Sequence, residues 1–99
     1  MKGIEISVFC LAYNCVKFIE KSIHGMLRQN VNAGYKIIIH DDASTDGTAD
    51  IIKMYAKKYP SRICAIIQPE NRYSQGIDIY REYIEPKLEG KYIAICEGG

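Results

Sequence analysis

Two adjacent aspartates follow a strongly β-branched segment in the middle of the chain. Asp41 and Asp42 come directly after the segment 37–40, which reads IIIH. Carboxylates can accept hydrogen bonds from the N–H groups of a ligand. Aspartate and serine also favour turns and helix caps, because their side chains bond to the nearby backbone. The pair by itself therefore leaves two interpretations open, a ligand site and a plain turn shaped by Ser44, Asp46 and Gly47.

Other polar or aromatic side chains stand at the ends of the neighbouring apolar runs. Tyr13 and Asn14 close the first run, and Arg72 lies in the loop after the third. The carboxyl ends of parallel strands meet at one edge of a sheet, which is where such sheets bind ligands. There an aromatic ring could stack on a nucleotide base, a carboxylate could accept the imide N–H of uracil or the N–H edge of guanine, and an arginine or a metal could meet a diphosphate.

Each of these side chains also has a simpler interpretation. Tyr13 could be a core aromatic residue, and Arg72 could be a solvated loop residue. His24 and His40 have no partner histidine at a metal-binding spacing, so both are interpreted as structural. The chain contains neither a GxGxxG nor a GxxxxGK[ST] motif, so it carries no dinucleotide fingerprint and no P-loop.

The elements that must position these residues follow from the apolar pattern. Four segments read as buried strands and three as amphipathic helices. The predicted strands are 4–13, 35–40, 63–68 and 91–96, and the predicted helices are 16–27, 51–59 and 77–85. Asn14 is expected to cap the first helix, Thr45 or Asp46 the second, and Pro86 to end the third. This alternation predicts an α/β fold with a parallel sheet.

The composition bounds the class of protein. The chain has 99 residues, with 47% apolar and 25% charged, which suits one small domain or a piece of a larger one. A net charge of +1 gives no electrostatic case for a nucleic-acid partner. No apolar run is long enough to span a bilayer, and the first residues are interpreted as a strand rather than a signal peptide. The four cysteines lack metal-site spacing, so reduced thiols and a cytoplasmic location are expected.

Taken together, the chain resembles the N-terminal half of the catalytic domain of family 2 glycosyltransferases. The motifs that carry the resemblance are ISVFCLAYN, IIIHDDASTDGT, QPENRYSQG and GKYIAICEGG. The resemblance implies a Rossmann-like GT-A half-domain, with about four mostly parallel strands in the order 3-2-1-4 and helices on both faces. It also implies an inverting transfer of a sugar from a nucleoside diphosphate donor, UDP by expectation, to a hydroxyl group during surface polysaccharide synthesis.

The resemblance assigns roles to particular residues. The tyrosine of the Tyr13-Asn14 pair would pack on the base, Asp42 would bond to it, and Asp41 would lie beside the pocket. Ser44, Asp46 and Gly47 would shape the turn into the second helix. Arg72, or a neighbour in its loop, would approach the phosphates of the donor.

The resemblance also implies groups beyond this chain. The aspartate cluster that holds Mn²⁺ or Mg²⁺ in the family would begin at or after Gly99, and the general base would follow it. Residues 1–99 are therefore expected to be the donor-nucleotide half of a longer enzyme, and inactive alone. One alternative is a non-catalytic fragment that self-associates through the exposed edge strand Tyr92–Cys96. A receiver-like signalling module is disfavoured, because receivers carry the acidic pair after the first strand.

Overall fold

The computed structural model describes residues 6–28 and 35–96, with the backbone alone for Tyr35 and residues 91–96. Strands and helical segments alternate along the chain, which confirms the predicted α/β class. The elements are β1 (Ile6–Ala12), α1 (Val16–Leu27), β2 (Tyr35–Asp41), α2 (Thr48–Lys58), β3 (Ile63–Ile67), η1 (Tyr73–Gln75), η2 (Tyr80–Ile84), η3 (Glu85–Lys87) and β4 (Lys91–Cys96).

The strands form one sheet in the order β3-β2-β1-β4, and each neighbouring pair is parallel. The chain moves outward from β1 to β3 and then returns to place β4 on the other side of β1. The strand order therefore reverses at β1, and the carboxyl end of β1 is the usual place for a ligand in such sheets. β4 is the outermost strand on its side of the sheet, as the self-association hypothesis requires. Self-association through this edge stays a prediction.

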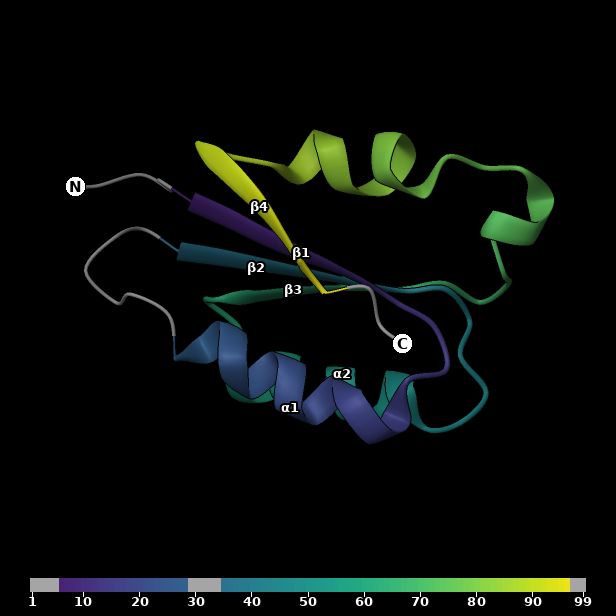
Figure 1. Ribbon diagram of the computed structural model, residues 1–99, viewed down its shortest axis with the longest axis horizontal. Coiled ribbons are helices and arrows are strands. Elements are labelled where there is room, and N and C mark those ends of the chain that lie inside the picture. The colour runs from purple at the N-terminus through teal and green to yellow at the C-terminus, as the bar shows by residue number, and fades with distance from the viewer. Residues whose placement is uncertain (1–5, 29–34, 97–99) are drawn as a thin grey trace.

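One face of the sheet is covered by α1 and α2, which lie side by side beneath the strands (Figure 1). Alternate residues of each strand point to this face, and they meet the apolar stripes of both helices. Ile37 and Ile39 of β2 pack there with Ile19 and Ile23 of α1 and Ile52 of α2, and all five are fully buried. This cluster is the larger of the two cores.

The other face is covered by the segment that contains η2 and η3 (Figure 1). Ile84 is buried against Phe9 and Ile38, and the ring of Tyr80 lies 5.4 Å from that of Phe9. The predicted helix over 77–85 is only partly right, since this segment forms one π-helical turn followed by a 3₁₀ turn. Pro86 sits in the 3₁₀ turn, where a continuing α-helix would need the N–H that proline lacks.

The cysteines differ from expectation at one position. Cys15 and Cys64 are free thiols, and burial raises the pKa of the Cys15 thiol. Cys10, in the middle of β1, is disulfide-bonded. The expectation of reduced cysteines is therefore wrong for Cys10, and the cytoplasmic location stays a prediction.

Candidate functional site

A cavity of about 390 Å³ lies at the carboxyl ends of β1 and β2. Its wall is mainly apolar and aromatic, with a small number of polar groups, which is typical of small-molecule sites. The lining residues are Leu11, Ala12, Tyr13, His40, Asp42, Asn71, Tyr73 and Ile79. Two of the predicted site residues, Tyr13 and Asp42, are thus brought together. Tyr13 is half exposed, at 50%, so its ring is open to a ligand and is not a core residue.

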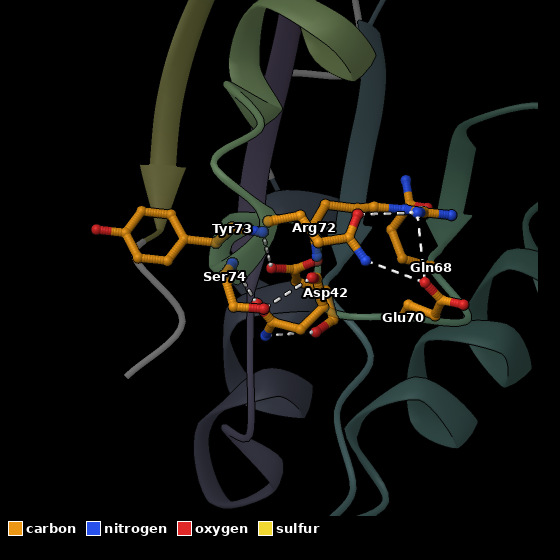
Figure 2. A network of polar contacts seen from close by, with 8 residues as sticks. Asp42, Gln68, Glu70, Arg72, Tyr73 and Ser74 are labelled. Atoms are coloured by element: carbon orange, nitrogen blue, oxygen red, sulfur yellow. Dashed lines mark hydrogen bonds and ion pairs between the residues drawn. The ribbon is translucent and has the colours of Figure 1, made fainter.

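Asp42 is the buried carboxylate of this cavity, with 4% of its surface exposed. One carboxylate oxygen accepts a hydrogen bond from the backbone N–H of Arg72 at 2.6 Å, and the other accepts one from Tyr73 at 3.0 Å. Figure 2 shows the carboxylate held between these residues. A carboxylate has about four acceptor positions, so two remain for a ligand.

The Arg72 side chain turns away from the cavity. Its Nε donates to Gln68 Oε1 at 3.0 Å, its guanidinium also bonds to Gln75, and Glu70 lies 3.8 Å away. In Figure 2 the guanidinium and the Tyr73 ring leave the backbone in opposite directions. The resemblance assigns Arg72, or a neighbour in its loop, to the donor phosphates. In the structure the Arg72 side chain bonds to Gln68 and Gln75, and the phosphate role stays a prediction.

Asp41 is fully buried but is turned into its own loop. Its carboxylate accepts hydrogen bonds from the backbone N–H and the hydroxyl of Ser44. Adjacent strand residues point to opposite faces of a sheet, which explains why Asp42 lines the cavity and Asp41 does not. The members of the pair therefore differ in structure: Asp41 shapes the turn and Asp42 lines the cavity. A ligand role for Asp42 stays a prediction.

Asn14 and Asp46 join the loops that follow β1 and β2. Asn14 donates its backbone N–H to Ser44 Oγ, and its side-chain oxygen accepts from the Thr45 N–H at 2.8 Å. Asn14 has a φ of +46° and its side chain is used across the loops, so Cys15 takes the helix cap position that was predicted for Asn14. Asn14 does not line the cavity. It supports the loop that carries Tyr13.

Asp46 binds the start of both helices. Its carboxylate accepts from the N–H of Val16, the first residue of α1, and from the N–H and hydroxyl of Thr48, the first residue of α2. Gly47 takes the cap position of α2 with a φ of +97°, a conformation that favours glycine. The hydrogen bond from the Thr48 hydroxyl, with smaller contributions from the Val16 and Thr48 N–H groups, lowers the pKa of the Asp46 carboxyl.

This lowered pKa predicts a pH-dependent contribution to stability. Because the folded-state pKa lies below the unfolded one, Asp46 stabilises the fold above the ordinary aspartate pKa of about 4 and loses this contribution as the pH falls through the lowered value. Asp46→Asn should therefore be less stable than wild type at neutral pH, and the difference should shrink toward pH 3 in urea titrations. Asp50→Asn, in the first turn of α2, is the matched control. A pH-independent difference for Asp46→Asn would contradict the role.

His40 was interpreted as structural, and it is fully buried at 0% exposure. It also lines the cavity, and its ring lies 5.4 Å from that of Tyr83. Its Nε2 is 3.3 Å from Gln68 Nε2, whereas its buried Nδ1 has no hydrogen-bond partner among the described residues. Burial lowers the pKa of His40, which keeps the imidazole neutral. The sequence signal for the position of His40 in the cavity wall was a polar residue at the end of an otherwise apolar strand.

Two further observations concern metals and membranes. In the part of the chain that the structure describes, no three His, Cys, Asp or Glu side chains are grouped so that they could hold a metal ion. The described residues thus do not fit the family's metal, whose expected position at Gly99 lies outside them. No helix within these residues is long and apolar enough to cross a membrane.

Comparison with known proteins decides the family. The model of the family described as glycosyl transferase family 2 matches residues 7–82, which include the loops after β1 and β2 and all of the residues that line the cavity. The chain belongs to glycosyl transferase family 2. The resemblance noted in the sequence is thereby confirmed.

Relatives of this family 2 chain include named bacterial glycosyltransferases. It is 34% identical over 92 residues to the putative teichuronic acid biosynthesis glycosyltransferase TuaG of Bacillus subtilis, covering 93% of this chain and 34% of the relative. It is 36% identical over 92 residues to WfaP of Escherichia coli, named as a UDP-Glc:α-D-GlcNAc-diphosphoundecaprenol β-1,3-glucosyltransferase, with the same coverage. The chain thus spans about a third of the length of these relatives.

A solved structure supports the fold. The mannosyltransferase PcManGT from Pyrobaculum calidifontis, determined in complex with GDP-Man and Mn²⁺, superposes with a TM-score of 0.60 at 24% identity. The match covers 69% of this chain and 20% of that one. At this identity the likeness shows the fold, and the predicted GT-A architecture is confirmed.

Proposed function

We propose that this family 2 chain forms the donor-nucleotide half of a glycosyltransferase. The observation that carries the proposal is the cavity where the strand order reverses, with an open aromatic ring, Tyr13, on the same wall as a buried carboxylate, Asp42. The base of a nucleotide would stack on Tyr13 and donate an N–H to Asp42. The sugar diphosphate would extend from the cavity toward solvent.

The reaction of the whole protein extends this proposal. We propose transfer of a sugar from a UDP-sugar to a hydroxyl acceptor with inversion, in surface polysaccharide synthesis, which the names of the Bacillus and Escherichia relatives support. Mn²⁺ or Mg²⁺ would supply neutralising charge at the leaving diphosphate. Because the described residues hold no group of metal ligands and the resemblance places the general base after them, we assign them binding and orientation of the donor.

Substitution of Tyr13 tests the site. Tyr13→Ala should weaken UMP binding by roughly ten- to a hundred-fold, since stacking on an aromatic ring contributes about 1–3 kcal/mol per base. The melting temperature should change little, because half of the side chain is already exposed. Titration of the amide NMR signals with UMP measures the affinity.

Phe18→Ala is the matched control. Phe18 is an aromatic residue of α1 with 59% exposure, and it does not line the cavity. Its removal should leave UMP binding unchanged. Equal effects of the two substitutions, or no response of the wild-type signals around Tyr13 and Asp42 to millimolar UMP, would contradict the proposed function.

A further inference from the structure

His40 and Asp42 approach the cavity from the same strand end. They are two residues apart, and side chains at that spacing point to the same face of a strand. Both line the cavity, and the negative charge of Asp42 acts on the His40 ring. A base that donates an N–H to Asp42 would therefore place the atoms next to that N–H on the side of the cavity that His40 lines.

The hydrogen bonds of Gln68 fix the tautomer of His40. Arginine can only donate, so the oxygen of the Gln68 amide must face Arg72 Nε, 3.0 Å away. The NH₂ group of the same amide then faces His40 Nε2 at 3.3 Å. A group that receives this donor must be unprotonated, so the proton of the neutral imidazole is on Nδ1. The lowered pKa of His40 agrees with this neutral form.

Among the described residues, the protonated Nδ1 of His40 is an unsatisfied hydrogen-bond donor. It is buried and has no hydrogen-bond partner among the residues that the structure describes. Buried polar groups are almost always paired in folded proteins, and exceptions call for a functional explanation. Because His40 lines the cavity, the cavity is the side of the ring from which a ligand would approach it.

We propose that His40 and Asp42 together select the nucleotide base by its hydrogen-bonding edge. This inference rests on the proposed donor-nucleotide function. The Asp42 carboxylate accepts the ring N–H of the base, and His40 Nδ1–H donates to the carbonyl oxygen next to it. Uracil and guanine both carry an N–H beside a carbonyl, so they are the bases that satisfy the pair.

Cytosine and adenine present the opposite pattern. Each has an unprotonated ring nitrogen where Asp42 requires a donor, and an amino group where His40 requires an acceptor. A lone pair would then face the carboxylate, and two donors would face each other. Sites that form hydrogen bonds with a ligand reject analogues lacking the matching groups strongly, because their own buried polar groups stay unpaired. His40 is thus a specificity-determining residue.

The test compares four nucleotides and three forms of the chain. Wild type is titrated with UMP, GMP, CMP and AMP by NMR, and UMP or GMP should bind about ten-fold or more tightly than CMP and AMP. His40→Phe keeps an aromatic ring against Tyr83 but removes the donor. It should lower the affinity for UMP and GMP by about five- to ten-fold and leave that for CMP unchanged or increased. The UMP and GMP arms separate a uracil site from a guanine site.

His40→Asn is the rescue variant, because its amide can place an N–H near the position of Nδ1. It should retain most of the preference for UMP or GMP over CMP. The ¹⁵N chemical shifts of the wild-type imidazole, measured without ligand, give an independent check and should show the Nδ1–H tautomer.

The outcomes separate this inference from the proposed function. An Nε2–H tautomer, or equal losses of UMP and CMP affinity in His40→Phe, would overturn the role of His40 while the nucleotide site stands. Absence of binding of all four nucleotides to the wild type would overturn both.

Discussion

Asp42→Ala should strongly weaken nucleotide binding and also destabilise the fold. The carboxylate supplies the acceptor for the base N–H, and hydrogen bonds to charged groups contribute about 1.5–3 kcal/mol. Its loss should weaken UMP binding by roughly ten- to a hundred-fold. The same substitution removes both hydrogen bonds that hold the backbone N–H groups of Arg72 and Tyr73.

The stability effect should be about 2–4 kcal/mol, somewhat below two full charged hydrogen bonds because water can reach exposed residues such as Tyr73. In a chain of this size that is a fall in melting temperature of roughly 10–20 °C. Affinity is measured by NMR titration at low temperature and stability by thermal unfolding. Glu70→Ala is the control, because it removes an equal charge at an exposed position of the loop that contains Arg72. An Asp42→Ala chain that still bound UMP like the wild type would remove Asp42 from the site.

Ile39→Ala should destabilise the chain most without changing the site. Ile39 is fully buried on β2, an inner strand of the sheet, in the cluster that α1 and α2 cover. Truncation of such a side chain removes apolar burial and leaves a cavity, which costs about 2–5 kcal/mol. Small domains have only about 5–15 kcal/mol of stability in total. Urea unfolding should therefore show a large loss.

Ile39→Ala should differ from Asp42→Ala in its effect on nucleotide affinity. Ile39 points away from the cavity, so the folded fraction of Ile39→Ala should bind UMP as the wild type does. Met54→Ala is the matched control, because Met54 is 53% exposed on α2 and its loss should change stability by no more than about 0.5 kcal/mol. A stability change in Ile39→Ala as small as that of Met54→Ala would contradict the packing described.

The strands and the strand-end residues were predictable because their patterns are local. Runs of β-branched residues identify buried strands, and the parallel topology then brings Tyr13 and Asp42 to one edge. The helical periodicity of α1 and α2 was equally clear. The segment 77–85 was harder, since three apolar residues at helical spacing do not distinguish an α-helix from the π turn that forms at η2.

The side-chain details depend on partners that are distant in sequence. Asn14 reads as a helix cap, but its side chain bonds to Thr45, 31 residues away. Asp46 reads as a cap for the following helix, and it also binds the start of α1. The direction of Arg72 depends on Gln68 and Gln75, and the tautomer of the buried His40 ring depends on Gln68 again. The type and position of one residue do not identify a hydrogen-bond partner that lies far away in the sequence.

The hydrogen bonds between the loops after β1 and β2 affect the rate of nucleotide association and the conformational entropy lost on binding. Asn14, Cys15 and Val16 each donate a backbone N–H to a side chain of the 44–48 loop. The ring of Tyr13 is therefore carried by a segment that is fixed before any nucleotide arrives. A preorganised loop loses little conformational entropy on binding. Substitutions at Ser44 or Thr48, which do not line the cavity, should accordingly slow nucleotide association and loosen the complex by freeing Tyr13 to move.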